Sequence, residues 1–485
     1  MQTTLKKSTD PMSVAADAIV VFVPQPAALV GPAAAADAAL DGLVGACIAD
    51  GEITGEAGQT TVVHTGGLIG AARLIVVGTG AGSVDDWRAA GRAAGAKSTA
   101  IKAHEVTAAP GDADVARVGA LIEGFGYGAY RFDRYKSAPG TTVDELRIYS
   151  LEVTPTQLRR AGRVADAVAA ARDLANAPAN DLTPTALAAR ATALADGTPG
   201  LECTVLERKD LQKLKAGAIL SVAQGSDEPP KMIVMRYTPT RSRAAGEVLG
   251  LVGKAVTFDT GGISIKPSAG MEEMKLDMAG GAAVVEAIGL IAQLALPIDV
   301  VAVVPATENM PSGTATRPGD VVRAMNGKTI EVINTDAEGR LILADALTYA
   351  ATVAGATRLI DFATLTGAIV VALGEVYAGL FGSDDAWTET VRRAGEASGD
   401  LCWPMPLHPG YAPLIASKVA DLSNAAAKRQ AGAVYAAQFL REFTDGLPWC
   451  HVDIAGTGMI GGAGTGFGVG LMLAVADALG ENRSR

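Results

Sequence analysis

The chain has 485 residues, more than the roughly 250 to 300 at which single hydrophobic cores stop growing, so two domains are expected. An apolar fraction of 49% with 19% charged residues excludes a disordered chain and indicates a well-packed globular protein. The net charge of −11 opposes attraction to the phosphates of nucleic acids or to anionic lipid. Neither nucleic acid nor a membrane surface is therefore an expected partner.

The N-terminal part alternates apolar runs with alanine-rich stretches, which predicts an α/β domain. Strands are expected at Ala18–Val23 and Leu74–Val77, and helices at Ala33–Ala46 and Val84–Ala94. The run Gly78-Thr-Gly-Ala-Gly-Ser83 follows a strand but lacks the dinucleotide spacing and a P-loop lysine. We interpret it as a glycine turn that closes the strand.

No segment predicts a membrane span or a secretory leader. The apolar runs Ala18–Val23 and Val300–Val304 are too short to cross a bilayer, and Asp10 and Asp17 interrupt the region that follows the first lysines. The four cysteines lie far apart without a C-x-x-C pair, which argues against a zinc knuckle or a disulfide framework. A cytoplasmic location is expected.

The pattern continues through one long amphipathic helix into a second, larger domain. We expect an N-terminal domain over 1–153, a connecting helix over 154–176 and a C-terminal domain over 177–485. In the last part, strands alternate with helical segments at Ala279–Leu296 and Leu341–Val353, which predicts a mixed, largely parallel sheet flanked by helices on both faces. The expected strands are Met232–Tyr237, Val248–Val252, Val300–Val304, Leu359–Ala363 and Cys450–Ile454.

Four carboxylates follow or end apolar runs of this second domain. Asp259, Asp277, Asp336 and Glu338 would be costly there if buried without positive partners. A divalent metal is the simplest partner, and a carboxylate-rich site suits magnesium, manganese or zinc. Several carboxylates can also bridge two ions roughly 3.5 to 4 Å apart.

Structural roles are the alternative for each of these residues taken alone. An Asp at a strand end often caps a helix or forms a turn, and Lys254, Lys266 and Arg340 could be ion-pair partners. The histidines form no H-E-x-x-H pair, so the common zinc protease motif is absent from the sequence. Together, however, the clustered residues favour a metal site.

Longer stretches around these residues resemble the leucyl aminopeptidase (cytosol aminopeptidase) family. The resemblance covers roughly residues 165 to 485, and the octapeptide Asn334–Leu341 matches the signature of that family. Further matches are Gly253–Gly262, Ile263–Pro267, Met274–Met278, Ala363–Ala368, Val452–Gly456 and Thr465–Gly468. The resemblance implies a smaller N-terminal α/β domain and a larger α/β catalytic peptidase domain.

The resemblance also implies a dinuclear centre that holds Mn²⁺ or Zn²⁺. Lys254, Asp259, Asp277 and Glu338 would ligate one ion, while Asp259, Asp336 and Glu338 would ligate the other. A lysine ligates only as the neutral amine, and a nearby dication would lower its pKa enough for that.

In the mechanism of the family, water held between the metals attacks the scissile carbonyl. Lys266 would polarise that carbonyl and stabilise the developing oxyanion. Arg340 resembles the residue that holds a bicarbonate ion, which acts as the general base.

By the same resemblance, the free α-amine of a peptide substrate binds one metal, and a pocket of apolar or small residues accepts the first side chain. A preference for leucine or methionine with broad specificity is expected, because such pockets separate neighbouring apolar side chains by only about 1 to 3 kcal/mol. The family forms hexamers, so a homohexamer is implied. The expected pocket residues are Met274, Thr364, Leu365, Gly367 and Ala455.

Three other hypotheses remain open at the level of the sequence. A two-metal phosphoesterase would need histidines or phosphate-binding residues that the matched motifs do not supply. A DNA-binding accessory protein is disfavoured by the acidic charge balance. A catalytically inactive relative would have no need of five ligands together with Lys266 and Arg340.

Overall fold

The computed structural model describes residues 1–7, 10–239, 246–426, 428 and 430–481. The chain divides into two compact units, Met1–Ala169 and Ala170–Arg485. A long helix, α5 (Pro155–Asn176), occupies the place of the expected connector, and the division falls within it. The domain limits 1–153 and 177–485 stay predictions.

The first unit contains a six-stranded sheet in the order β1-β6-β5-β2-β4-β3. Only β3 runs antiparallel to its neighbour in this order. Helices α3 (Val84–Ala100) and α4 (Val115–Ala129) pack against each other beside it. The strands are β1 (Gln2–Lys6), β2 (Ala16–Val23), β3 (Thr60–His64), β4 (Ala71–Gly78), β5 (Glu105–Ala109) and β6 (Glu145–Tyr149).

The single helix predicted over Ala33–Ala46 is wrong. The structure has α1 (Gly31–Ala39) and α2 (Leu43–Ala49), which meet at an angle of 111°. Asp41 and Gly42 between them have φ of 55° and 81°, in the left-handed region that ends a right-handed helix. Gly78–Ser83 forms a turn, in which Gly82 N donates to Thr79 O at 2.9 Å, and it leads into α3.

The second unit is built on a nine-stranded mixed sheet in the order β16-β15-β18-β14-β9-β11-β8-β7, with β10 paired to β11. Strands β18, β14, β9, β11 and β10 are parallel neighbours, whereas β8, β7 and β15 pair antiparallel. The strands are β7 (Leu201–Leu206), β8 (Lys231–Tyr237), β9 (Val248–Gly253), β10 (Ala255–Asp259), β11 (Asp299–Asn309), β14 (Arg358–Ala363), β15 (Ala378–Gly382), β16 (Cys402–Pro404) and β18 (Trp449–Asp453).

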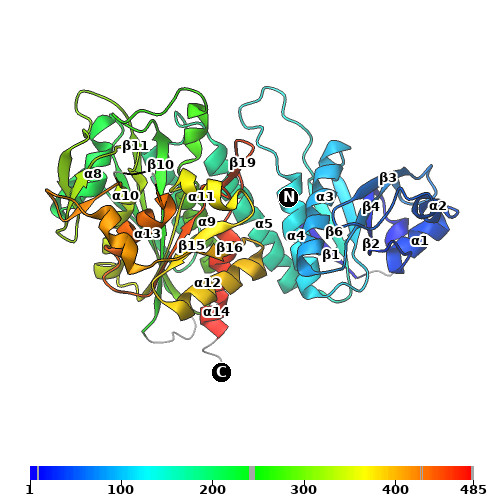
Figure 1. Ribbon diagram of the computed structural model, residues 1–485. Coiled ribbons are helices and arrows are strands. Elements are labelled where there is room, and N and C mark those ends of the chain that lie inside the picture. The colour runs from blue at the N-terminus through cyan, green and yellow to red at the C-terminus, as the bar shows by residue number, and fades with distance from the viewer. Residues whose placement is uncertain (8–9, 240–245, 427, 429, 482–485) are drawn as a thin grey trace. The chain divides into compact units, whose positions relative to one another are not determined.

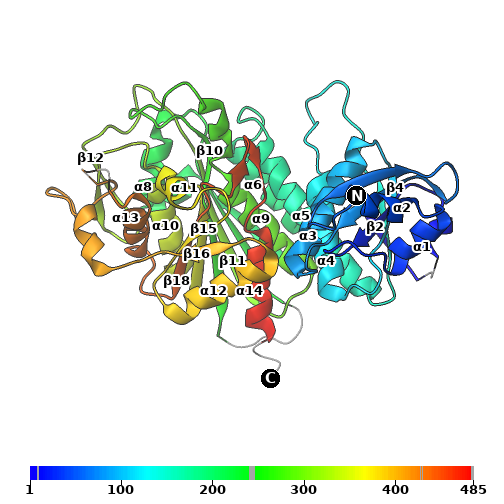
Figure 2. The same ribbon diagram turned by 45° about the vertical axis from the view of Figure 1, so that its right-hand side comes forward.

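Helices cover both faces of this sheet (Figures 1 and 2). Helix α10 (Gly339–Thr352) contacts β9, β11 and β14 and packs with α8 (Gly217–Val222) and α13 (Gly432–Arg441). Helix α9 (Ala279–Gln293) contacts the same strands and packs with α14 (Val469–Glu481). Because both faces are covered, the central strands are buried almost throughout, as parallel strands normally are. The predicted two-domain α/β fold class is confirmed.

Among the described residues, the helical stretch Met271–Gln293 has the length and composition of a membrane span. Its mean hydropathy is 1.3 over the most apolar window, but 94% of that window is buried inside the unit. It corresponds to a short 3-10 helix, η3 (Met271–Leu276), followed by α9, and it packs on the sheet like the core helix of a globular protein.

Candidate metal centre

The expected ligands gather at the edge of the second sheet where its parallel strands end. Lys254 follows β9, and Asp259 is the last residue of β10. Asp277 follows η3, and Asp336 and Glu338 lie in the turn that leads into α10. Ligand sites of α/β sheets lie characteristically at this carboxyl edge, so the topology brings together residues that are far apart in sequence.

Two lysines are interleaved with these carboxylates. Lys254 Nζ lies 2.7 Å from Asp277 Oδ2 and 2.8 Å from Glu338 Oε1. Lys266 Nζ lies 2.8 Å from Asp259 Oδ2 and also pairs with Asp336. Lys254, Asp259, Asp277 and Glu338 are all buried, whereas the side chain of Lys266 retains 21% exposure.

The chemistry of this donor set fits divalent metal ions. Asp259, Asp336 and Glu338 each offer an oxygen within 4.8 Å of the others. When ionised, the four carboxylates carry four negative charges against two positive charges on Lys254 and Lys266. An excess of two negative charges in a largely buried cluster is unfavourable unless a cation compensates it, and oxygen ligands suit hard dications.

The pKa values show the same imbalance. Burial, reinforced by the neighbouring Glu338, raises the pKa of Asp259 to about 6. Burial also raises the pKa of Asp277 and of Asp336. Burial opposes ionisation of Glu338 as well, but Lys254 and Lys266 outweigh it and lower its pKa. In the metal-free protein, then, three of the four carboxylates hold protons more tightly than they would in water.

The pKa values of the two lysines shift in favour of the charged form, unlike those of the three carboxyl groups. Burial disfavours the ammonium of Lys254, but Asp277, Glu338 and Asp259 outweigh this effect and raise its pKa. Burial likewise disfavours the ammonium of Lys266, but the negative charges of Asp259 and Glu338 outweigh this effect and raise its pKa. Lys254 is thus a charged ion-pair partner in the metal-free protein, and it could act as a ligand only after losing that proton.

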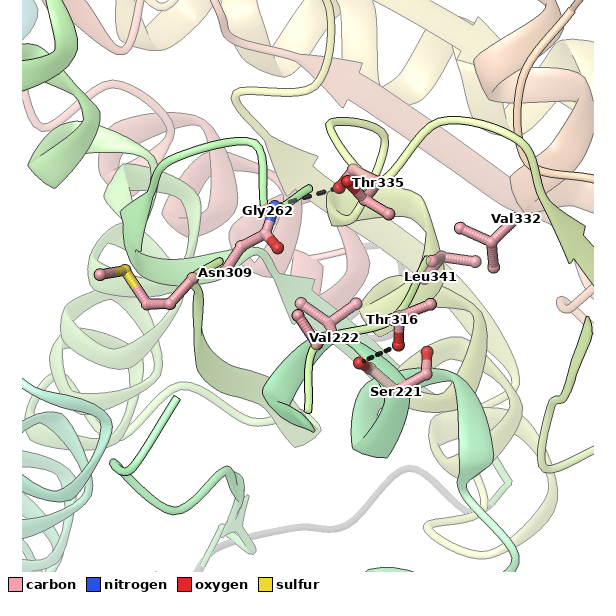
Figure 3. A pocket seen from close by; sticks show the side chains of 10 residues that line it. Ser221, Val222, Gly262, Asn309, Thr316, Val332, Thr335 and Leu341 are labelled. Atoms are coloured by element: carbon pink, nitrogen blue, oxygen red, sulfur yellow. Dashed lines mark hydrogen bonds between the residues drawn. The ribbon is translucent and has the colours of Figure 1, made fainter. Parts of the chain in front are cut away.

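Asn309, at the end of β11, holds the carboxylate cluster in place through two hydrogen bonds. The sequence did not predict this role. Its buried amide donates to Asp259 Oδ1 at 2.8 Å and to Thr335 O at 3.0 Å. Figure 3 shows Asn309 and Thr335 beside a small pocket that Gly262 also lines. The amide thereby fixes one carboxylate oxygen of the cluster and the turn that carries Asp336.

Glycines are required at two places by close approach to the cluster. Gly261 has φ of 86°, and a Cβ there would lie 2.8 Å from Asp336 Oδ1. A Cβ at Gly339 would lie 2.6 Å from Cε of Lys254. These contacts explain why the two matched motifs have glycine at these positions, because a side chain at either position would displace a charged group.

Arg340 is buried in the first turn of α10. Its Nη1 donates to Asn424 O at 2.7 Å, and its guanidinium carbon lies 5.1 Å from the centre of the Tyr435 ring. Nε is buried and has no hydrogen-bond partner among the described residues. A buried donor without a partner is unfavourable, and a small anion would satisfy it.

The expected pocket residues lie around the same edge. Thr364 is buried after β14, Leu365 and Ala455 are half-buried and adjoin the same apolar core, and Gly367 is exposed at the start of α11 (Gly367–Leu373). Met274 lies in η3, and its carbonyl accepts the N–H of Asp277 at 3.3 Å. Their contribution to a substrate pocket stays a prediction.

Comparisons with known proteins agree with this architecture. Residues 169–473 match the model of the cytosol aminopeptidase family, catalytic domain, and residues 20–139 match the N-terminal domain of that family. A probable cytosol aminopeptidase of Solibacter usitatus (strain Ellin6076) is 49% identical over 418 residues, which cover 84% of this chain and 86% of the relative.

Solved structures are similar over nearly the whole chain. A mutant of tomato leucine aminopeptidase has a TM-score of 0.89 and 33% identity, covering 98% of this chain and 96% of its own. The bottromycin maturation enzyme BotP in complex with Mn has a TM-score of 0.84 and 34% identity, covering 96% and 100%. The chain therefore belongs to the cytosol aminopeptidase family and is a metal-dependent aminopeptidase, a hydrolase.

Proposed function

We propose that this enzyme removes the N-terminal residue of peptides, with a preference for leucine or other apolar residues, at a centre of two Mn²⁺ or Zn²⁺ ions. The observation that carries the proposal is the carboxylate cluster of the buried Asp259 and Glu338 and the half-buried Asp336, with its excess of negative charge. The Mn named in the BotP complex supports manganese as one candidate.

The residues that would hold the two ions form two sets, and both sets would include Asp259 and Glu338. Lys254 and Asp277 complete one set, and Asp336 completes the other. The proximity of Lys254 to Asp277 and Glu338, at 2.7 and 2.8 Å, supports the first set. The bound ions would lower the pKa of a coordinated water and so supply a nucleophile at neutral pH.

Lys266 would act on the substrate carbonyl. Its Nζ pairs with Asp259 and Asp336, which places it beside the proposed ions, and its partial exposure leaves it accessible to a peptide. A fixed positive charge beside the scissile carbonyl would stabilise the negative charge that develops on its oxygen.

Arg340 would hold a bicarbonate ion, which would supply the general base. The support is its buried Nε, which has no hydrogen-bond partner among the described residues. The N–H groups of a guanidinium match the oxygens of a planar anion in geometry and charge.

The first residue of the substrate would be oriented through two of its groups. Its free α-amine would bind one metal, which restricts cleavage to the first peptide bond, and its first side chain would enter a pocket formed by Met274, Thr364, Leu365, Gly367 and Ala455. The half-buried, apolar character of Leu365 and Ala455 supports a preference for apolar side chains.

We further propose a cytoplasmic homohexamer. The name cytosol aminopeptidase, which the curated relatives carry, supports this location. The hexamer rests on the resemblance to the family alone, and sedimentation of the purified protein would test it.

The test is hydrolysis of a leucyl amide that releases a chromophore, after chelation and restoration of Mn²⁺ or Zn²⁺. We expect metal-dependent cleavage that Asp336→Ala and Lys266→Ala strongly reduce, and none when the amino group is acetylated. An alanyl amide should be cleaved more slowly than the leucyl amide. Equal cleavage of the acetylated amide, or no cleavage of any unblocked amide with any metal, would exclude the proposed function.

A further inference from the structure

Asp453, the last residue of β18, is a fully buried carboxyl group outside the proposed ligand sets. It accepts hydrogen bonds from Leu365 N at 3.1 Å, Thr366 Oγ1 at 2.6 Å and Ala455 N at 3.3 Å. All these partners are donors, so the group acts purely as an acceptor, as an ionised carboxylate does. A buried carboxylate needs such partners, and here they come from two segments of the expected substrate pocket.

The strand that carries Asp453 also carries a fully buried imidazole. His451 lies two residues earlier on β18, and its Nδ1 is 2.6 Å from Asp361 Oδ1 on β14. The other oxygen of Asp361 accepts a hydrogen bond from Trp449 Nε1 at 2.7 Å. Burial disfavours the imidazolium, but Asp361, and more weakly Asp453, outweigh it and raise the pKa of His451. The buried imidazole of His451 therefore interacts with two buried carboxyl groups, those of Asp361 and Asp453.

The loop that Asp453 holds is bound from its other side by the proposed metal ligands. Thr364 O accepts a hydrogen bond from Lys254 Nζ at 3.0 Å, and Thr364 Oγ1 donates to Asp277 Oδ1 at 2.7 Å. Residues 364–366 are thus fixed between Asp453 and two of the ligands. A shift of this loop would move both contacts together.

We propose that Asp453 is a positioning residue that holds the loop of residues 364–366 so that Thr364 orients Lys254 and Asp277 for metal binding. This inference rests on the proposed dinuclear site. Residues that orient ligands through hydrogen bonds affect metal affinity strongly, commonly by about 10- to 100-fold when they are removed. Asp453 would act through Thr366 and Leu365, without touching the metal or the substrate.

A purely structural role is the competing explanation. Thr366 Oγ1 also accepts the N–H of Ile369 at 3.2 Å and so caps α11, and Asp453 could serve only to orient that cap. A structural role predicts a lower melting temperature with unchanged metal affinity in the folded protein. A positioning role predicts weaker metal binding in protein that is still folded.

The experiment is a calorimetric titration with Mn²⁺ of the full-length protein after a chelator has removed its metal. Circular dichroism and the melting temperature are recorded for each variant. Asp453→Asn should weaken Mn²⁺ binding by about tenfold or more. Asp345→Asn is the matched control, because Asp345 is equally buried and accepts two backbone N–H bonds, from Ile219 at 2.9 Å and Met325 at 2.7 Å. Asp345→Asn should lower the melting temperature and leave Mn²⁺ affinity within about twofold of wild type.

A second pair of variants covers the case in which Asp453→Asn does not fold. Thr366→Ser keeps the hydroxyl that donates to Asp453, whereas Thr366→Val removes it. We expect Thr366→Ser to retain wild-type Mn²⁺ affinity and Thr366→Val to lose it, with a rise in KM for leucyl amides that exceeds the fall in kcat.

The outcomes separate this inference from the proposed function. Unchanged Mn²⁺ affinity in folded Asp453→Asn, or in Thr366→Val where Asp453→Asn does not fold, would overturn the positioning role while leaving the aminopeptidase site intact. An equal loss of affinity in Asp345→Asn would also overturn it, because the effect would then be one of general stability. Wild-type protein that binds no Mn²⁺ would overturn the proposed site, and this inference with it.

Discussion

The carboxyl edges of the two sheets differ in what they carry, although both belong to α/β layers. In the first unit the edge opens into a cavity of about 640 Å³ whose lining includes Phe22, Thr79, Trp87 and Arg117. In the second unit the corresponding edge holds buried carboxylates that lie 2.7 to 2.8 Å from the ammonium groups of the buried Lys254 and the partly exposed Lys266. The strand arrangement thus provides a place for a site, and the residues at the strand ends decide its chemistry.

Among the described residues, each unit contains one histidine–aspartate pair, and the two pairs have contrasting surroundings. His451 and Asp361 are fully buried at 2.6 Å, whereas His104 and Asp144 are 3.0 Å apart with side chains that are 57% and 66% exposed. The same pair of residue types should therefore contribute very differently to stability, because water screens one pair and not the other.

The largest expected effect comes from breaking the buried pair. Asp361→Asn should lower the free energy of unfolding by about 3 to 5 kcal/mol, because it leaves the buried imidazole without its counter-charge. Asp144→Asn, the same change in the exposed pair, should cost only a small fraction of that. Chemical denaturation of both variants measures the difference, and equal losses would refute the contrast.

Next in size is the effect of removing a charge at each carboxyl edge. Lys266→Met should lower kcat on leucyl amides by about 10²- to 10³-fold, as expected for the loss of one group that stabilises a developing oxyanion. Arg117→Ala, at the edge of the first sheet, should leave kcat/KM within about twofold. Steady-state kinetics of both folded variants measures these effects. A comparable loss of kcat/KM in Arg117→Ala would show that the edge of the first sheet takes part in catalysis.

A smaller effect is expected from adding one methyl group in each unit. Gly339→Ala should destabilise the protein by about 1 to 3 kcal/mol, because the new Cβ would lie 2.6 Å from Cε of Lys254. Gly119→Ala in α4 meets no atom within 4 Å and should stabilise by about 0.5 to 1 kcal/mol, because alanine favours the helix. Melting temperatures that shift in the same direction would contradict this difference in packing.

Local sequence patterns predicted most of the fold and the ligand candidates. Strands such as β9 and β14 were recognisable because buried parallel strands are short apolar runs, and the proposed ligands Asp336 and Glu338 lie within one contiguous motif. The helix over Ala33–Ala46 was wrong because alanine-rich composition concealed the left-handed residues Asp41 and Gly42.

The supporting residues could not be predicted because their partners are distant in sequence. Asn309 reaches Asp259 across 50 positions, and His451 reaches Asp361 across 90. Asp453 lies within a matched motif, but only the fold shows that its carboxylate holds the loop beside Thr364. Such roles depend on which strands become neighbours, and periodicity alone does not specify that.

The most direct test of the dinuclear site is anomalous diffraction from crystals of the enzyme grown with Mn²⁺. Two peaks are expected roughly 3.5 to 4 Å apart, both within ligand distance of Asp259 and Glu338, with Lys254 bound to one ion as a neutral amine. Peaks elsewhere, or none at this cluster while Lys254 keeps its ion pairs with Asp277 and Glu338, would contradict the dinuclear site.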